Sequence, residues 1–447
     1  MKRKLGISEK VVWLLGEAGS NNIVIITEIS GSLPEEVLRE ALVLIPKKHP
    51  LLNVHIELAR NIPIFVTGAP NIPLRIIELN SPEQWIQETN DEMNLPFSWE
   101  KGPLVRVVWL RSEKVHLLLI TLHHAISDGK SGVYLVRDLL SITAEILSGD
   151  AIISHVPLPE RPPSEEIIPA SFSGFKGVLG MLKTGLRQNL MLAKQPQNFA
   201  IEKDVPLQQI RRCVIHRILS EETTRLLTVR CRQEKTSVHG ILCAIMMKAS
   251  AQKINGQEVV RLCCLSAINL RHLLIPPIKD DIGFYASVLS TFHQVGVETS
   301  SWNLAREVKT NLSHLLEQGE VLAALMLQKN ILSLRCPSSI KMAQQVNQFF
   351  RATTGVSNLG RVEIPENYGS LALRKLHFCV SGNAFPQKSI GIAVTTFREQ
   401  MILNFLFSVP HISPHNAEIF VDYAIETLEQ ALELPKDNYY KVAPNSS

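Results

Sequence analysis

The feature that most limits how this chain can fold is a nearly uninterrupted apolar run that ends in two histidines. Residues 115–124 read VHLLLITLHH, and residues 104–110 read LVRVVWL. The stretch 111–114 between them predicts the turn of an antiparallel hairpin. Because successive side chains of a strand point to opposite faces, a strand that is apolar throughout needs cover on both faces. We therefore expect a sheet that is covered on both sides.

The segments around this hairpin alternate between strand-like and helix-like patterns, which predicts an α/β (α+β) fold. The expected strands are 22–29, 49–58, 62–68, 259–268, 283–293 and 390–409. The expected helices are 33–45, 81–92, 131–147 and 415–432, and two more helices open at Ser220 and Ser237. Pro46 is expected to end the first of these helices, Ser81 to cap the second and Gly149 to end the third.

A proline-rich stretch between residues 152 and 170 interrupts this alternation. Its prolines are Pro157, Pro159, Pro162, Pro163 and Pro169. Prolines at this density stiffen the chain and deny it a regular ladder. We therefore interpret the stretch as a linker.

The segment 172–196, which follows, is both basic and apolar. No acidic residue occurs between Glu166 and Glu202. Its four basic residues are Lys176, Lys183, Arg187 and Lys194. Two interpretations stay open: an amphipathic surface that contacts a membrane or a lipid-bearing carrier, or a helix packed across the fold with a solvated basic face.

Composition excludes other classes of protein. The net charge is only +4 from 46 basic and 42 acidic residues, whereas a nucleic-acid partner requires a concentrated basic face. The seven cysteines are odd in number and form no C-x-x-C, which favours reduced thiols in the cytosol. The opening MKRKLGISEK lacks the apolar run of a signal peptide, and no apolar stretch is long enough to span a membrane. We expect a cytoplasmic protein, with peripheral membrane contact through 172–196 as the open alternative.

The reactive chemistry is expected in residues 121–132, TLHHAISDGKSG. Its spacing, His-His-x-x-x-Asp-Gly, comprises His123, His124, Asp128 and Gly129. A neutral imidazole, with a reference pKa of about 6.5, can take a proton near neutral pH. On a regular strand the two histidines point to opposite faces, so one can be a base while the other packs. Asp128 is also a favoured helix cap, and Gly129 permits close approach of backbone or substrate.

This motif resembles the HHxxxDG signature of the condensation-domain and acyltransferase superfamily. That superfamily includes nonribosomal peptide condensation domains, plant BAHD acyltransferases and mycobacterial polyketide-associated acyltransferases. Other segments are similar to the family too: REALVLIPKKHPLLNVHIE, NLPFSWEKGPLVRVVWL, KTSVHGILCAIMMKA, INLRHLL and DIGFYASVLST. The resemblance covers roughly residues 4–432. The opening RKLGISE and the segment VSNLGRV at 356–362 most resemble the stand-alone mycobacterial type, the phthiocerol dimycocerosyl transferases.

The resemblance implies two lobes like chloramphenicol acetyltransferase, each a mixed sheet flanked by helices, with a channel between them. The N-terminal lobe would span residues 1–150, a linker or crossover segment 151–205, and the C-terminal lobe 206–447. The resemblance also implies that no metal or resident cofactor is bound. A monomer is expected.

The resemblance further implies an acyltransferase in which His124 is the general base. His124 would deprotonate a hydroxyl or amine acceptor, which attacks an acyl thioester on coenzyme A or on the phosphopantetheine arm of an acyl carrier protein. His123 and Gly129 would be structural, and Asp128 would pair with an arginine, for which Arg271 in Asn269-Leu270-Arg271 is the candidate. Transfer to oxygen is favoured over transfer to nitrogen.

One departure from the family concerns the oxyanion stabiliser. The DFGWG segment of many relatives is absent, and VSNLGRV occupies a comparable late region. Ser357 and Asn358 are therefore candidate hydrogen-bond donors to the tetrahedral intermediate or contacts for substrate, or else ordinary turn residues. Two alternative functions stay open: a stand-alone condensation domain that joins carrier-bound amino acids, and a non-catalytic relative that binds a carrier protein or a lipid.

Overall fold

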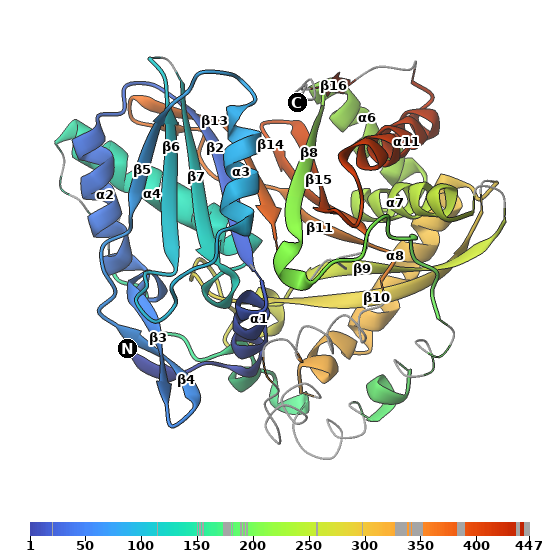
Figure 1. Cartoon of the computed structure of the whole chain (residues 1–447), viewed down its shortest axis with the longest axis horizontal. Helices are drawn as coiled ribbons and strands as arrows, with labels where there is room; N and C mark the ends of the chain where they lie inside the picture. The colour runs from blue at the N-terminus through green and yellow to red at the C-terminus, as the bar shows by residue number, and fades with distance from the viewer. Residues whose placement is uncertain are drawn as a thin grey trace. The chain divides into compact units, whose positions relative to one another are not determined.

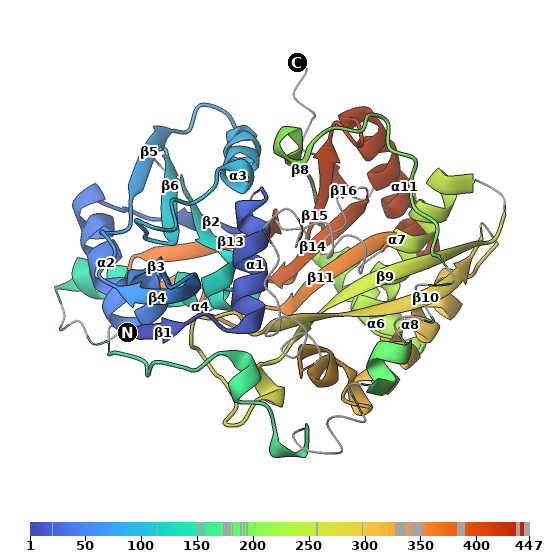
Figure 2. The same cartoon turned by 60° about the horizontal axis from the view of Figure 1, so that its bottom comes forward.

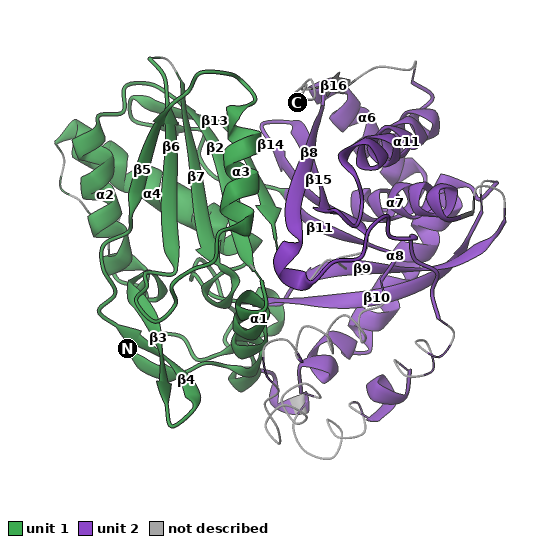
Figure 3. Ribbon diagram, in the orientation of Figure 1, with its two compact units in different colours: residues 1–167, 271–285, 361–382 green, residues 168–270, 286–360, 383–447 purple. Residues whose placement is uncertain are grey.

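The structure, a computed structural model, describes most of the chain. The described residues are 1–19, 21–113, 115–149, 156–172, 195–255, 258–296, 298–326, 352–381, 389–434 and 439–441, with 151, 153, 180, 182–187, 190, 193, 338 and 341. The chain divides into two compact units (Figure 3). Unit 1 comprises residues 1–167, 271–285 and 361–382, and unit 2 comprises 168–270, 286–360 and 383–447.

The two units are not continuous in sequence, which differs from the expected succession of an N-terminal lobe, a linker and a C-terminal lobe. Two segments from the second half of the chain, 271–285 and 361–382, fold with the N-terminal residues. The physical reason is pairing: the strand β13 (Leu371–Val380) forms an antiparallel ladder with β2 (Asn22–Ser30). Hydrogen bonds fix residues 271–285 in the same unit, as described below.

Unit 1 contains a six-stranded sheet in the order β12-β13-β2-β7-β6-β5. The remaining strands are β5 (Leu74–Glu78), β6 (Val105–Arg111), β7 (Val115–His123) and β12 (Asn367–Tyr368). The predicted hairpin is present, because β6 and β7 pair antiparallel, whereas β5 and β6 are parallel. All β7 residues after Val115 are buried. The central strand is thus covered on both faces, as its apolar sequence predicts.

Helices cover the two faces of this sheet. The helix α3 (Gln84–Asn94) and the helix α4 (Gly129–Ser148) lie on opposite sides (Figure 1). The helix α2 (Glu35–Lys48) packs on α4. The Thr121 hydroxyl of β7 donates to Glu92 of α3 at 2.7 Å, so that alternate residues of β7 point to α3.

Two helix boundaries differ from the prediction. Pro46 does not end α2, which continues to Lys48 with this proline in its last turn. Proline has no N–H group, so it removes one hydrogen bond from this turn, and the helix ends two residues later. Ser81 does not cap α3, which begins at Gln84 with Glu83 at the cap position. Gly149 does end α4, in a left-handed conformation with φ of 71°.

A second, smaller sheet of unit 1 has the order β1-β4-β3, comprising β1 (Lys2–Lys4), β3 (Val54–Ala59) and β4 (Ile62–Thr67). Figure 2 shows it near the N-terminus of the chain. The helix α1 (Ile7–Glu17) follows β1 and contacts the short 3-10 turn η2 (His124–Ile126). The N-terminal residues therefore pack beside the predicted motif.

Unit 2 contains a seven-stranded sheet in the order β10-β9-β11-β14-β15-β8-β16. Its strands are β8 (Arg211–Leu219), β9 (Val260–Asn269), β10 (Ala286–Val295), β11 (Thr354–Arg361), β14 (Ile390–Phe397), β15 (Gln400–Val409) and β16 (Tyr439–Lys441). The sheet is mixed, since β11 runs parallel to β9 and β10 antiparallel. Every residue of β14 is buried, so both of its faces are covered.

Three described helices of unit 2 begin within one residue of where the sequence predicts: α6 (Glu221–Gln233), α7 (Val238–Asn255) and α11 (Pro414–Leu432). A fourth described helix, α8 (Ser301–Glu317), is not among the predicted ones. The Ser220 side chain accepts a hydrogen bond from the Thr223 amide, which satisfies a free donor of the first turn of α6. The expected class of fold, mixed sheets flanked by helices in two lobes, is confirmed. No helix in the described ranges is long and apolar enough to cross a membrane.

Candidate active site

The two motif histidines lie at the point where β7 ends, and they have different surroundings. His123 is the last residue of β7, and its Nδ1 atom accepts a hydrogen bond from the Ala125 amide at 3.0 Å. Its ring meets Phe97 edge-on, with 5.9 Å between the ring centroids. Burial lowers the pKa of His123 to about 3, with smaller effects from His124 and Arg106. His123 is therefore a neutral packing residue that orders the turn.

His124 opens the 3-10 turn η2, so its side chain leaves the alternation of the strand. Its Nδ1 atom lies 2.7 Å from the Ser127 carbonyl oxygen. Because a carbonyl can only accept, Nδ1 carries the proton of the neutral ring, and the basic lone pair is on Nε2. No described residue forms a hydrogen bond with Nε2, and the side chain keeps 9% of its surface exposed.

The surroundings of His124 keep its imidazole neutral. Burial lowers its pKa, and the Ser127 carbonyl and the charge of Asp128 oppose this only in part. The ring of Phe284 meets the imidazole edge-on, with the centroids 5.0 Å apart. At neutral pH the side chain therefore presents a free Nε2 lone pair, which is the form that a general base needs.

Asp128 is both a helix cap and the partner of a buried arginine, so the two expected roles coexist. Its Oδ1 atom accepts from the Ser131 amide at 2.7 Å and from the Arg271 Nη2 atom at 2.9 Å. Its Oδ2 atom accepts from the Tyr285 amide at 3.0 Å. Both side chains of the ion pair are buried, with 6% of Asp128 and 4% of Arg271 exposed. The carboxylate thus holds the start of α4 against residues 271–285 and forms no hydrogen bond with His124.

Ser131 completes this network, although the sequence did not single it out. Its hydroxyl lies within hydrogen-bonding distance of two acceptors, the Gly283 carbonyl at 2.8 Å and Asp128 at 2.9 Å, and its single proton can be donated to one of them at a time. The same oxygen accepts from the Gly283 amide at 3.1 Å and from Arg271 at 2.8 Å. Ser131 lies three residues after Asp128, where its backbone amide can donate to a capping side chain. This spacing predicts the cap by Asp128 but no long-range partner for the Ser131 hydroxyl.

The structure places the other predicted residues as follows. Gly129 is the first residue of α4, whereas a tight helix-to-strand approach occurs at Gly132, where an added Cβ would clash with the Ile25 side chain. Ser357 and Asn358 lie on β11, in unit 2. The Asn358 Oδ1 atom accepts a hydrogen bond from the Gly360 amide at 2.8 Å, as in an Asx turn. Their role as oxyanion donors stays a prediction.

Metal and covalent chemistry have few candidates here. In the described ranges, no three His, Cys, Asp or Glu side chains are grouped so that they could hold a metal ion. The six described cysteines are free thiols, and five of them are buried. The arrangement around His124 combines one neutral base with apolar and aromatic neighbours. It can remove a proton from a polar group that approaches Nε2.

Comparisons with known proteins identify the family of the chain. Residues 14–157 match the family model of the condensation domain, and residues 209–406 match that of the phthiocerol/phthiodiolone dimycocerosyl transferase C-terminus. The chain therefore belongs to the condensation-domain and acyltransferase superfamily.

Among curated relatives, surfactin synthase subunit 2 of Bacillus subtilis is 28% identical over 130 residues. The aligned stretch covers 29% of this chain and only 4% of that synthase. Among solved structures, polyketide synthase associated protein 5 of Mycobacterium tuberculosis has a TM-score of 0.66 at 17% identity, over 96% of this chain and 97% of its own. Trichothecene 15-O-acetyltransferase of Fusarium sporotrichioides has a TM-score of 0.75 at 12% identity, over 96% and 95%. At these identities, the two structures establish the fold alone.

Proposed function

We propose that this protein is an acyltransferase that moves an acyl group from a thioester to a hydroxyl or amine acceptor, with His124 as the general base. The observation that carries this proposal is the state of His124: Nδ1 is bound to the Ser127 carbonyl, and Nε2 is without a described hydrogen-bond partner. The superfamily assignment supports the same class of reaction.

The reaction would proceed through one proton relay. His124 Nε2 takes the proton of the acceptor as the acceptor oxygen or nitrogen attacks the thioester carbonyl. The tetrahedral intermediate then collapses, the C–S bond breaks, and the imidazolium returns the proton to the thiolate. Asp128 takes no part in this transfer, because its oxygens are occupied by Arg271, Ser131 and Tyr285.

Donor and acceptor are proposed by chemical class. The donor would be an acyl thioester of coenzyme A or of a phosphopantetheine arm on an acyl carrier protein. The acceptor would be a small-molecule or lipid alcohol, with an amine second. No metal or resident cofactor takes part in this proposal, because the imidazole and the thioester supply the base and the leaving group.

The pH dependence of acyl transfer tests this function. The wild-type protein is assayed with a panel of acyl thioesters and alcohol or amine acceptors, by release of free thiol and mass spectrometry of the product. We expect transfer, with kcat/KM constant near neutral pH. Because burial lowers the pKa of His124 and the neutral form is active, the rate should fall only as the pH drops below about 6.5. Thiol release without acyl product, or an acid limb above that pH, would contradict the proposal.

Two alternative functions make different predictions in the same assay. A stand-alone condensation domain, favoured by the match to a surfactin synthase subunit, would form an amide between two carrier-bound aminoacyl groups and reject free alcohols. A non-catalytic relative would bind a carrier protein or a lipid without product formation. The free Nε2 atom of His124 favours the catalytic interpretation, since a protein that only binds has no use for an available base.

We also propose that the segment 172–196 contacts an anionic membrane surface. Most of the segment, including Lys176 and Lys194, lies outside the described residues. Within its described part, the exposed side chains Leu182, Leu186 and Leu190 are spaced four apart, as on one face of a helix. Arg187 binds the buried Glu320 of unit 2 at 2.8 Å, which holds a different face inward.

Replacing these leucines should weaken membrane binding. The L182N/L186N/L190N variant should partition at least about tenfold less onto vesicles of phosphatidylcholine and phosphatidylglycerol, because each buried leucine contributes about 1.5–3 kcal/mol. Sedimentation with vesicles measures this. L58N/L95N, which changes two other exposed leucines, is the control. Equal partitioning of the triple variant and the wild type would refute the membrane contact.

A further inference from the structure

The segment 271–285 supplies the long-range hydrogen bonds of Asp128 and Ser131. It leaves β9 of unit 2, belongs to unit 1 and returns to β10. From it, Arg271 and the Tyr285 amide bind Asp128, and Gly283 binds Ser131 through both its amide and its carbonyl. Phe284 provides the aromatic edge against His124. The position of this segment therefore sets where the ring of Phe284 lies against His124.

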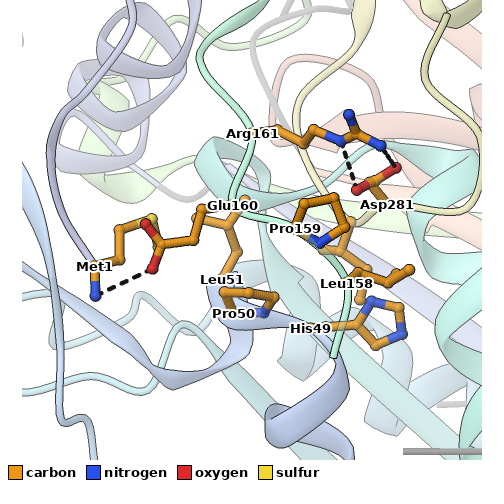
Figure 4. A pocket seen from close by; sticks show the side chains of 10 residues that line it. Met1, His49, Pro50, Leu51, Leu158, Pro159, Glu160, Arg161 and Asp281 are labelled. Carbon is orange, nitrogen blue, oxygen red and sulfur yellow. Dashed lines mark hydrogen bonds and ion pairs between the residues drawn. The ribbon is translucent and has the colours of Figure 1, made fainter. Parts of the chain in front are cut away.

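Two arginines of unit 1 bind neighbouring aspartates of this segment. Arg161 forms two hydrogen bonds with Asp281, Nε to Oδ1 at 2.9 Å and Nη2 to Oδ2 at 3.3 Å (Figure 4). Arg137 binds Asp280 with a single contact of 2.9 Å. The two pairs differ in burial, since 6% of the Asp281 side chain is exposed against 43% of Asp280. A two-point contact to a buried carboxylate fixes both position and orientation, which a single exposed contact does not.

Asp281 is also linked directly to the ion pair of the motif. Its carbonyl oxygen accepts a hydrogen bond from the Arg271 Nη1 atom at 3.3 Å. On the other side, Arg161 comes from the proline-rich stretch and is followed by Pro162 and Pro163, which stiffen its backbone. Arg161 and Asp281 form part of the wall of a small cavity of about 20 Å³, which Leu158 and Pro159 also line (Figure 4). Arg161 thus joins a stiff segment to the residue beside Arg271.

We propose that Arg161 is a positioning residue for the acyl transfer: by holding Asp281, it keeps Phe284 against His124 and Arg271 on Asp128. The expected effect of Arg161 on the rate of acyl transfer rests on the proposed function, whereas its expected effect on the pKa of His124 does not. Without Arg161, the buried Asp281 carboxylate loses its charged partner and will move toward water. The segment then loosens, and the ring of Phe284 no longer excludes water from His124.

The change should be visible in the titration of His124. The charged group that faces His124 is Asp128, whose charge is balanced by Arg271, and the adjacent His123 is neutral. Burial is the main cause of the low pKa of His124. Rehydration of the ring therefore raises this pKa toward its ordinary value of about 6.5. A loss of global stability alone would leave the titration of the folded protein unchanged.

The test combines NMR titration of the His124 ring with kinetics on the full chain. In R161M we expect the His124 pKa and the acid limb of kcat/KM to move up together, and kcat to fall about 10- to 100-fold because a small misplacement is costly. R161K should give a partial effect, and the exchanged pair R161D/D281R should restore the titration. R39M, which removes a solvent-exposed pair with Glu35, should change neither.

The outcomes separate this proposal from the proposed function. An R161M protein that keeps the His124 titration of the wild type overturns the positioning role, whatever its activity. A titration that shifts in R161M but is not restored in a folded R161D/D281R protein also overturns it, since the pair would then not be the cause. If the wild type transfers no acyl group while the R161M titration still shifts, the proposed function fails and the positioning of His124 by Arg161 stands.

Discussion

Substitution of His124 by alanine or asparagine should lower kcat of acyl transfer by about 10²–10⁴-fold, the usual contribution of a positioned general base. Neither side chain can take a proton from the acceptor, and no described side chain is hydrogen-bonded to Nε2 in the wild type. The KM for the thioester should change little, because the lost interaction concerns the proton in transit and not donor binding. Steady-state kinetics with a thioester that the wild type uses would measure this.

The asparagine variant makes the test specific. Asparagine can still donate a hydrogen bond to the Ser127 carbonyl, which His124 Nδ1 does in the wild type, so the turn η2 should keep its shape. The control is H55N, which changes a histidine in a pair with Glu57, away from the motif, and should leave turnover unchanged. Wild-type rates in H124A and H124N would show that the protein uses another base or none.

Removal of the Asp128 side chain should destabilise the protein by about 3–5 kcal/mol, because it leaves the buried Arg271 without its charged partner. In D128A, the Ser131 and Tyr285 amides lose an acceptor as well. D128N retains an oxygen acceptor and should fall between D128A and the wild type. The free energy of unfolding from urea titration gives these differences.

An exposed ion pair provides the matched control for this measurement. R39A removes the surface pair with Glu35, and such pairs contribute about 0–1 kcal/mol. If D128A cost no more than R39A, the buried network would have no structural role, and Asp128 would have to be reconsidered as a direct participant in the reaction. R271M should lower the free energy of unfolding about as much as D128A does, because either substitution leaves one charge of this buried ion pair behind.

Local features of the fold could be predicted because they depend on neighbouring residues. The run 115–124 predicts β7, and serine at 220 predicts the start of α6. A single helix-breaking residue predicts a boundary less well: Pro46 predicts the end of α2 but lies inside its last turn. Strand β13, LALRKLHFCV, was not predicted, since its apolar residues follow no strict alternation and its register with β2 shifts between Leu373 and Lys375.

The residues of the site likewise fall into those that nearby sequence predicts and those that it does not. The motif residues His123, His124 and Asp128 are close in sequence, and their spacing alone indicated chemistry. Only the resemblance to the family indicates Arg271 as the partner of Asp128. The two residues are 143 positions apart, and the sequence around Asp128 contains no pattern that points to so distant a partner. Gly283 and Tyr285 contribute backbone atoms, which every residue has, so no residue type could reveal them. The ring contact of Phe284 with His124 likewise depends on the fold of the segment and not on its composition.

The discontinuity of unit 1 has a consequence for the order in which the chain can fold. During synthesis, the N-terminal residues emerge first, and domains that are continuous in sequence can fold as they emerge. Here one edge of β2 stays unpaired until residues 371–380 are synthesised. The ion pair of Asp128 likewise cannot form until Arg271 is synthesised. A ribosome that pauses between these points exposes an apolar strand edge, which is a template for wrong pairing. Completion of unit 1 is therefore coupled to translation of most of unit 2.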